Sequence, residues 1–526
     1  MPIDVLWIVA SAAAVVAVSV VTLKWLRVGQ REHYIPGSVT EMALLWLRVR
    51  PVNSLIVLSA CVALGIALAA GIGLVALPDL VVAILVIVSL ALIALVPLGL
   101  SAKGRTSALG WTPRLQRLAA LTVFLLIGLS VLFSSLVGFA ALGIVVLYAA
   151  PIADLALLIL RPVEKAMSKK FLVAARKRLG QVRPRIVAIT GSYGKTSTKG
   201  YVAHVLGDTF STVASPASFN NLMGLSRAVN ERVVPGTEVF VAEMGINAPG
   251  QIRELAKSFP PDIAAITTIG EAHIARLKSR EVIFAAKSEI TETARIVVLP
   301  IDEPMLAGLA ETCREQGKTV ITVSTVPGTA ADVVVDAANE TVSVSEAGRT
   351  ESARVVIPSV GHAVNLAVAV GIARALDVSL STISARLSAL PDSRHRAEIQ
   401  QAASGVTIVD DTYNSNPVGA DRAARGAAEL AAERGGDFVV VTPGMVELGR
   451  VQFERNRAFA ATIAELGGHV FAIARTNRAA LVAGGSSGPH PVRLFDRREE
   501  AVAAALDQAG DRGVILYEND LPDHYP

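Results

Sequence analysis

The sequence predicts an α-helical transmembrane region that is followed by an α/β region with parallel sheets. The first observation is a lopsided hydropathy: the chain is mostly apolar before Leu160 and has the composition of a soluble protein after it. The second is a run of β-branched residues, Ile186 to Ile189, that leads through a glycine loop into a helical pattern. The third is the alternation of strand-like and helix-like segments after this loop, which indicates parallel sheets. The 526 residues leave room for roughly three structural units.

Candidate membrane spans are runs of about 20 apolar residues. The runs are residues 3–23, 55–77, 80–100 and 118–160, of which the last is long enough for two spans with a turn near 134–138. We therefore expect a transmembrane region of about five helices over residues 1–160. The first run lacks a basic start and a clear small-residue cleavage site, so we interpret it as an anchor rather than a signal peptide.

The Lys and Arg residues beside these runs predict the orientation of the region. Basic residues occur in every second connection, and the other two connections carry none. They are Lys24, Arg27, Arg31, Arg48 and Arg50 after the first run, Lys103, Arg105, Arg114 and Arg117 after the third, and Arg161, Lys165, Lys169, Lys170, Arg176, Lys177 and Arg178 after the last. Because basic loops stay in the cytoplasm, we expect a multi-pass protein of the plasma membrane with an outside N-terminus and a cytoplasmic C-terminal part. Residues 161–184 are expected to form a basic interfacial linker.

Charge and cysteine content exclude several classes of protein. The net charge of +4 is small and the basic residues gather beside apolar runs, which indicates a membrane surface and no nucleic-acid partner. Cys61 and Cys313 are too few for a zinc cluster, so we expect free cysteines in a reducing compartment. Asp154 lies inside an apolar run but toward its end, where a carboxylate is usually solvated or paired, so we infer no ion path from it.

The glycine loop has the pattern of a phosphate-binding loop. Between a strand and a helix it contains Gly191, Ser192, Tyr193, Gly194, Lys195, Thr196 and Ser197. Glycines allow backbone N–H groups to converge on phosphate oxygens, and the helix N-terminus adds a positive dipole. Lys195 would neutralise the β- and γ-phosphates, and the Thr196 hydroxyl would ligate Mg²⁺. Since the spacing GxxGKT is shorter than GxxxxGK[ST], an ordinary glycine turn with an exposed lysine stays open as the alternative.

Three further polar residues follow this loop in the chain. Glu243 ends a hydrophobic strand beside the loop, where a Mg²⁺ ligand belongs, although a helix-capping role fits it equally. His273 follows another buried strand, at 263–268, but lone histidines are more often structural. Lys287 lies on a helix with Glu289 nearby, and its alternative is a solvated helix face.

The rest of the chain indicates a second parallel-sheet domain after a boundary near Pro391. Before it, Asn220 and Asn221 form a polar loop that caps a helix or touches a ligand, and residues 361–376 read as an amphipathic helix. After it, strand-like segments alternate with helices, and one strand ends in Asp410 and Asp411 ahead of an Asn-rich loop.

Taken together, five separated motifs make the chain resemble the Mur ligase family. They are TGSYGKTST at 190–198, EMGINAPGQI at 243–252, TTIGEAHIARL at 267–277 with AAKSEI at 285–290, DDTYNSNP at 410–417 and GMVELG at 444–449. Within the family the chain is most similar to the type that adds D-alanyl-D-alanine. The resemblance implies a P-loop ATPase-like central ATP-binding domain at 185–391 and a Rossmann-like C-terminal domain at 392–526.

The resemblance also implies the cofactors ATP and Mg²⁺ and a set of site residues. Thr196, Glu243 and His273 would hold the metal, and Lys195 would bind the ATP phosphates. Lys287 matches the lysine that many members carry as a carbamate, which is an additional metal ligand. The catalytic set is therefore Lys195, Lys287, His273 and Glu243.

The remaining residues that the resemblance implies surround the nucleotide and the substrates. Asn365 matches the adenine-side asparagine, and Arg396 with Asp411 matches the C-terminal pair that closes on the nucleotide. The substrate side is Asn220, Asn221, Tyr413, Asn414 and Asn416.

The chain departs from the family pattern in three places. The opening GHAVN replaces the usual HNxxN, Thr442-Pro443 replaces the usual GD before the MxELG stretch, and membrane spans stand where the family has its UDP-binding domain. We therefore expect an ATP-dependent carboxylate–amine ligase of cell-wall precursor synthesis, which acts through an acyl phosphate. Its partners would be a wall-precursor or lipid-linked carboxylate acceptor, an amino acid or dipeptide amine, the lipid bilayer and other wall-synthesis membrane proteins.

Three alternatives to this expectation remain. A polyglutamate-type membrane amide ligase shares the phosphate loop, but DDTYNSNP and GMVELG argue against it. A catalytically inactive nucleotide-binding scaffold for wall synthesis is disfavoured by the intact set of Lys195, Glu243, His273 and Lys287. An ATP-driven transporter lacks an ABC signature.

Overall fold

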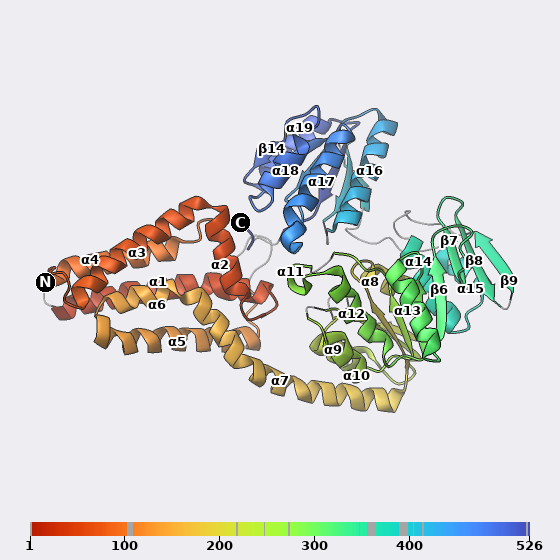
Figure 1. Cartoon of the computed structure of the whole chain (residues 1–526), viewed down its shortest axis with the longest axis horizontal. Helices are drawn as coiled ribbons and strands as arrows, with labels where there is room; N and C mark the ends of the chain where they lie inside the picture. Colours follow the sequence, from red (N-terminus) through yellow and green to blue (C-terminus); the bar gives the residue numbers. More distant parts are fainter. Residues whose placement is uncertain are drawn as a thin grey trace. The chain divides into compact units, whose positions relative to one another are not determined.

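The computed structural model divides into two compact units (Figure 1). The described residues are 3–102, 109–216, 219–246, 248–271, 274–346, 348–354, 363–388, 398–402, 404–412, 415–521 and 524–526. Unit 1 consists of Met1–Ala166 with Ala474–Thr476 and Asp520–Pro526. Unit 2 consists of Met167–Ile473 with Asn477–Asn519.

Unit 1 is built from apolar helices around one buried cluster. The helices are α1 (Ile3–Arg31), α2 (Ser38–Val49), α3 (Pro51–Gly71), α4 (Asp79–Leu95), α5 (Pro113–Val137), α6 (Ala140–Leu147) and the first part of α7 (Ala149–Val182). Their shared core includes Trp25, Trp46, Leu64, Leu90 and Leu118. Many other large apolar side chains of these helices face outward, as expected where the surroundings are lipid.

Among the described residues, three helices are long and apolar enough to cross a membrane, or four if a bent pair counts as one span. The three are Ile8–Arg31, Pro51–Gly71 and Pro113–Val137, and the pair is α6 with α7, bent by 63°. The expected count of about five spans stays a prediction, because α4, with 17 residues, is apolar but falls among the shorter helices of the unit.

Asp154, a carboxylate inside an apolar run, caps a helix. It accepts hydrogen bonds from the backbone N–H groups of Gly37 and Thr40, each at 2.8 Å, and from the Thr40 hydroxyl at 2.6 Å. Gly37 is the N-cap of α2, so the carboxylate satisfies donors that the helix itself cannot pair. The expectation that Asp154 is paired is confirmed.

A buried lysine has the corresponding role at a helix C-terminus. The Lys24 ammonium donates to the carbonyl oxygens of Ala94, Leu95 and Val96 at 2.9, 3.0 and 3.3 Å, where α4 ends. Arg50 donates to the Leu98 carbonyl in the same stretch at 3.0 Å. These basic residues therefore bind unpaired carbonyls and are part of the packing of unit 1.

The last residues of the chain belong to unit 1. The Trp46 indole donates to the His524 carbonyl at 2.8 Å, and His524 Nε2 lies 2.9 Å from the Glu32 carboxylate. The side chains of Trp46, Glu32 and His524 are all buried, and Tyr525 packs against the apolar cluster of unit 1. The C-terminal domain expected at 392–526 thus ends in a tail that packs with the helices.

Unit 2 begins with a nine-stranded sheet in the order β2-β3-β1-β4-β5-β6-β7-β8-β9. The strands are β1 (Arg185–Thr190), β2 (Thr212–Ala214), β3 (Val239–Glu243), β4 (Ile263–Ile266), β5 (Ile296–Pro300), β6 (Thr319–Ser324), β7 (Val333–Asp336), β8 (Thr341–Glu346) and β9 (Arg349–Arg354). The pairs from β2 through β7 are parallel, and β8 and β9 add antiparallel strands. In register, Ile189 pairs with Glu243 and Thr190 pairs with Ile266, so three strands end at one edge.

Helices cover both faces of this sheet, which explains why its central strands are buried throughout. One face carries α8 (Lys195–Leu206), α14 (Ala363–Ala375) and α15 (Leu380–Leu387); the other carries the end of α7, α9 (Leu222–Arg232), α10 (Gln251–Ser258), α12 (Arg280–Ser288) and α13 (Pro304–Glu315). Two short elements, α11 (Ile274–Leu277) and η1 (Glu289–Thr291), flank α12. Ala363 and residues 365–373 are buried, so the amphipathic helix expected at 361–376 is instead a core helix.

A six-stranded sheet completes unit 2, in the order β10-β11-β15-β12-β13-β14. Its strands are β10 (Glu398–Gln401), β11 (Thr407–Asp411), β12 (Phe438–Thr442), β13 (His469–Ile473), β14 (Arg493–Phe495) and β15 (Val514–Glu518). All pairs are parallel except the edge pair of β10 with β11. One face packs on α16 (Pro417–Arg434), α17 (Gln452–Glu465), with η3 (Gly449–Val451) before it, and α18 (Arg478–Gly485), and the other packs on α19 (Arg498–Ala509). The expected second parallel-sheet domain is therefore present.

The linker and the cysteines can be placed as well. Residues 161–182 continue α7 without a break, so the expected interfacial linker is the second part of one long helix. Both cysteines are free, Cys61 exposed and Cys313 buried, as expected.

Candidate active site

The glycine loop after β1 has a conformation that requires its glycines. Gly194 precedes α8 with φ of 79°, and a Cβ atom there would lie 2.0 Å from Oδ1 of Asn365. A Cβ atom on Gly191 would lie 1.9 Å from the Thr267 hydroxyl oxygen. Glycine is therefore the residue that fits both positions, and the loop backbone lies directly against β4 and α14.

The loop is fixed by polar contacts with the segment that follows β4. The Tyr193 N–H donates to the Thr268 hydroxyl at 3.1 Å, and the Gly270 N–H donates to the Ser192 hydroxyl at 2.8 Å. The Thr198 hydroxyl donates to the Asn365 side chain at 3.3 Å, and Ser197 is buried beside it on α8. The glycine loop with α8, the segment after β4 and the start of α14 are thus connected by hydrogen bonds.

Two lysines converge on one carbonyl of this loop. Lys195 Nζ donates to the Gly191 oxygen at 2.7 Å, and Lys287 Nζ donates to the same oxygen at 2.9 Å. Lys287 is only 1% exposed, which excludes the solvated helix face as its role. Burial, together with the nearby positive charge of Lys195, lowers the pKa of Lys287 well below its ordinary value. The chemistry of a carbamate begins with a neutral amine, so this environment fits that expectation.

Glu243 lies at the end of β3, next to the start of α8. Its Oε2 accepts from the Thr196 hydroxyl at 3.0 Å and from Lys199 Nζ at 2.9 Å, and Asn220 Nδ2 lies 3.4 Å from Oε1. Glu243 and Lys199 are both buried. Glu243 therefore interacts with the glycine-loop helix and does not cap a helix.

Sequence reasoning missed Lys199. Its spacing of one helical turn after Lys195 places it on the same side of α8, and this was the available signal. A lysine inside an amphipathic helix is ordinarily solvated, which is why the spacing alone did not distinguish it.

The donors at this strand edge fit a magnesium ion held jointly with phosphate. Among the described residues there is no group of three or more His, Cys, Asp or Glu side chains that could hold a metal by itself. One carboxylate, Glu243, and one hydroxyl, Thr196, lie 3.0 Å apart beside the glycine loop. Mg²⁺ commonly takes one or two protein ligands and completes its shell with water and substrate phosphates, so this donor set suits it.

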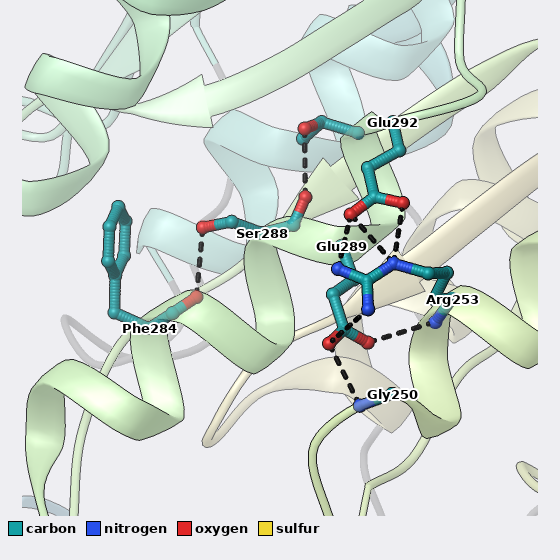
Figure 2. A network of polar contacts seen from close by, with 7 residues as sticks. Gly250, Arg253, Phe284, Ser288, Glu289 and Glu292 are labelled. Atoms are coloured by element: carbon teal, nitrogen blue, oxygen red, sulfur yellow. Dashed lines mark hydrogen bonds and ion pairs between the residues drawn. The ribbon is translucent and has the colours of Figure 1, made fainter.

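A network of hydrogen bonds and ion pairs connects the segment after Lys287 to the start of α10 (Figure 2). The Glu289 carboxylate accepts from the backbone N–H groups of Gly250 at 2.8 Å and Arg253 at 3.0 Å, which cap the start of α10. The Arg253 guanidinium pairs in turn with Glu292, at 2.6 Å. Helix α12 and η1 are thereby connected to the segment that follows Glu243, and Glu289 has a structural role that fixes the position of Lys287.

A cavity of about 480 Å³ lies beside the glycine loop, between the two sheets of unit 2. Its lining includes Tyr193, Gly270, Arg280, Asp421 and Arg455. Arg455 pairs with Glu271 across the cavity, with Nε 2.8 Å from the carboxylate. A volume of this order is typical of sites that bind small molecules.

The C-terminal sheet contributes polar residues at its own carboxyl edge. Asp411 ends β11, and the Asn416 side chain caps α16 by accepting from the Gly419 N–H at 2.9 Å. Asn221 caps α9 in the same way through the Gly224 N–H. Glu518, at the end of β15, is fully buried, and burial with the neighbouring Asp411 charge raises its pKa to about 8. Sequence reasoning missed Glu518, which ends an apolar run as Glu243 does but has no glycine loop near it in the sequence.

Four expected site residues lie outside the described residues. They are His273, Arg396, Tyr413 and Asn414. The residues that the structure brings together around the glycine loop are Lys195, Thr196, Glu243, Lys287, Asn220 and Asn365.

Two domain families match unit 2. Residues 189–373 match the Mur ligase middle domain, and residues 395–517 match the Mur ligase, glutamate ligase domain. This part of the chain belongs to the Mur ligase family. The match covers both sheets and the loop that connects β1 to α8.

Relatives and solved structures agree with this assignment. UDP-N-acetylmuramoyl-tripeptide–D-alanyl-D-alanine ligases are 33% identical over 246 residues in Mycobacterium tuberculosis and 32% identical over 288 residues in Bacillus subtilis. These matches cover 44% and 53% of this chain and 46% and 60% of the relatives, so the chain spans about half the length of the curated relatives it matches.

The fold of unit 2 is also that of known Mur ligase structures. MurF from Acinetobacter baumannii superposes with a TM-score of 0.57 at 24% identity, over 67% of this chain and 77% of that one. MurF from Thermotoga maritima in complex with ADP has a TM-score of 0.56 at 22% identity, over 67% of this chain and 80% of that one.

Proposed function

We propose that the protein is a membrane-anchored, ATP-dependent amide ligase of the MurF type that acts in cell-wall precursor synthesis. The observation that carries the proposal is the convergence of Lys195, Thr196, Glu243 and Lys287 on one glycine loop at the carboxyl edge of a parallel sheet. Ligands of such sheets bind at this edge. The similarity to UDP-N-acetylmuramoyl-tripeptide–D-alanyl-D-alanine ligases supports the same assignment.

The first step is activation of the acceptor by ATP. A carboxylate oxygen of the acceptor attacks the γ-phosphorus, the bond to the ADP oxygen breaks, and an acyl phosphate forms. The glycine-loop N–H groups and the α8 N-terminus would bind the phosphates, and Lys195 would balance the charge that develops on them. Asn365, which lies against Gly194, would contact the nucleotide on the side of α14.

Magnesium would be held by Thr196 and Glu243, with His273 and a carbamate on Lys287 as the ligands implied by the family. When bound, the ion neutralises negative charge on the phosphates and aligns them for in-line transfer. Lys199, whose Nζ lies 2.9 Å from Oε2 of Glu243, would orient that buried carboxylate. The depressed pKa of Lys287 supports its assignment as the carbamate-bearing residue.

The second step joins the amine to the activated acceptor. The amine nitrogen attacks the acyl carbon, phosphate leaves with the electron pair of its C–O bond, and the nitrogen loses a proton. Water would compete with the amine, so the reaction requires a dry cleft, and the cavity between the two sheets is the candidate. By the family resemblance, Arg396 and Asp411 would close on the nucleotide, and Tyr413, Asn414 and Asn416 would lie near the incoming amine.

The acceptor is proposed to be a lipid-linked wall precursor. Unit 1 carries three apolar helices that are candidate spans, and such a region suits a protein whose substrate is held at the plasma membrane. A UDP-linked muramoyl peptide is the acceptor class in the names of the relatives, and their amine is D-alanyl-D-alanine. The catalytic domains would be cytoplasmic, where ATP is available.

The test is phosphate release by the full chain in detergent with ATP, Mg²⁺ and D-alanyl-D-alanine. Lipid-linked and UDP-linked muramoyl peptides are compared as acceptors, and release should require both acceptor and amine. Lys195→Ala should abolish it, whereas Lys257→Ala, at an exposed lysine of α10, should not. No acceptor-dependent release with either precursor would overturn the ligase assignment, and release with only the UDP-linked form would overturn the lipid-linked one.

A further inference from the structure

A buried carboxyl group joins three strand ends of the C-terminal sheet. Glu518 ends β15, the strand between β11 and β12, and its side chain is fully buried. The Thr442 hydroxyl at the end of β12 donates to Oε2 at 2.5 Å. The Ser415 hydroxyl, in the loop that follows β11, donates to the other oxygen. One side chain is thus hydrogen-bonded to the segments on both sides of its own strand.

Further hydrogen bonds extend this cluster along the same edge. The Gly444 N–H donates to the Thr442 hydroxyl at 2.9 Å, and Asn519 Nδ2 donates to the Gly444 carbonyl at 2.7 Å. The Asn519 N–H donates to the Asp411 carbonyl at 3.2 Å. The two loops that begin at Asp411 and at Pro443 are therefore both fastened to the end of β15.

Stability by itself does not explain why a carboxyl group is buried at this position. A buried carboxyl must be protonated or paired, and an apolar side chain of similar size is often the more stable choice. A hydrogen-bonded polar group instead specifies where its partners lie. Of the partners of Glu518, Ser415 lies within the motif segment 410–417, and Thr442 accepts a hydrogen bond from Gly444, the first residue of the motif segment 444–449.

We propose that Glu518 is a positioning residue that holds the loops after β11 and β12 in the arrangement needed to bind the incoming amine. The proposal rests on the proposed ligase function for its substrate and on the hydrogen bonds above for its geometry. Glu518 acts through Ser415 and Thr442, because its own side chain has no exposed surface.

The test compares Glu518→Ala with Glu518→Gln in the full chain, with Glu429→Gln on the exposed face of α16 as the matched control. Glutamine keeps the size and hydrogen-bonding oxygen of a protonated carboxyl, whereas alanine removes the hydrogen bonds to Ser415 and Thr442. The first readout is hydrogen exchange in peptides that cover 407–419 and 438–449. The second is the KM for D-alanyl-D-alanine and the kcat of phosphate release, with ADP affinity as the measure of the nucleotide side.

Glu518→Ala should speed exchange in both peptides and raise the amine KM about tenfold, the equivalent of one lost hydrogen-bonded contact. ADP affinity should stay unchanged in Glu518→Ala. In Glu518→Gln, the exchange rates and the amine KM should match those of the unmodified chain. Ser415→Ala, a milder change, should speed exchange in 407–419 and leave 438–449 unchanged.

Two outcomes would overturn the proposal. One is unchanged exchange in Glu518→Ala, and the other is a lower unfolding temperature with an unchanged amine KM, which would make Glu518 a core residue only. If the unmodified chain releases no phosphate, the ligase function fails, but the exchange data still decide whether Glu518 holds the two loops.

Discussion

Buried charged side chains occur in both units of the molecule, but they have different partners. In unit 1, Asp154 and Lys24 bind backbone groups at the ends of α2 and α4. In unit 2, the buried Lys287 and Glu243 and the half-buried Lys195 interact at the carboxyl edge of a sheet, on one glycine loop and the helix that follows it. A charge that satisfies a helix end stabilises the fold, whereas several charges that converge on a loop can act on a ligand.

The difference shows that burial of a charge is not by itself evidence of function. Asp154 lies inside an apolar run of the sequence, and its oxygens accept hydrogen bonds from the start of α2. For Lys287 the sequence left a solvated helix face open as the alternative, yet the side chain is buried against the glycine loop. Substitutions at four sites, Lys287, Asp154, Glu518 and Glu289, test this distinction, beginning with the largest expected effect.

The largest effect is expected from Lys287. Lys287→Ala should lower acceptor- and amine-dependent phosphate release about 10²- to 10³-fold, because it removes a preorganised charge from the reaction centre. Lys287→Arg should be equally impaired, since arginine does not form the carbamate. The labelled-bicarbonate carbamate signal, measured by NMR, should disappear in both variants. Activity close to that of the unmodified chain in Lys287→Arg would contradict the assignment.

Asp154 should affect unit 1 and leave the chemistry unchanged. Asp154→Ala leaves three backbone donors and a hydroxyl without their acceptor, and we expect a loss of roughly 2 kcal/mol or more. All four tryptophans precede residue 112, so thermal unfolding followed by tryptophan fluorescence reports on unit 1 alone.

Asp154→Asn keeps an acceptor oxygen and should lose less stability than Asp154→Ala. ADP affinity should be the same in both variants. A loss of ADP binding with unchanged tryptophan unfolding would reverse the roles that we assign to the two regions.

Glu518 should make the stability of unit 2 depend on pH. Its pKa is about 8 in the folded protein and near 4.5 when unfolded, so between these values the folded form holds a proton that the unfolded form has lost. Its contribution to stability is therefore complete below about pH 4.5 and is lost as the pH rises to about 8, with a slope of roughly 1 kcal/mol per pH unit.

Calorimetric unfolding of Glu518→Gln should lack this slope, since glutamine does not titrate. Subtracting the two pH profiles removes the contribution of all other groups. Parallel profiles would show that Glu518 does not hold its proton in this range.

The smallest effect is expected at the network that holds η1. Glu289→Gln weakens the anionic cap of α10, and we expect a loss of about 1 kcal/mol. Hydrogen exchange at Gly250 and Arg253 should increase. Glu292→Gln is the matched control, because Glu292 contacts the Arg253 side chain and not the α10 backbone. Equal exchange rates in both variants would show that Glu289 does not hold the segment that carries Lys287 in place.

Much of the architecture could be predicted from local sequence patterns. The strand at Ile186 to Ile189, the helix that starts at Lys195 and the strand that ends at Glu243 all have clear periodicity or composition, and the structure contains each of them. Apolar content identified a run at 80–100 but could not show that its helix ends at Leu95. The helix at 361–376 was predicted to be amphipathic, since its packing between a sheet and α8 cannot be read from its own residues.

The sequence by itself determined the order of the elements and the presence of a glycine loop followed by lysine and threonine. These features depend on neighbours within a few residues, which is the range over which periodicity and turn chemistry act. The tertiary structure decided which charges meet: Lys199 with Glu243, Lys287 with Gly191 and Glu518 with Thr442. These partners are 44, 96 and 76 positions apart in the sequence. They meet only because the pairing of parallel strands brings the ends of the strands, and the helices that follow them, to one edge of the sheet.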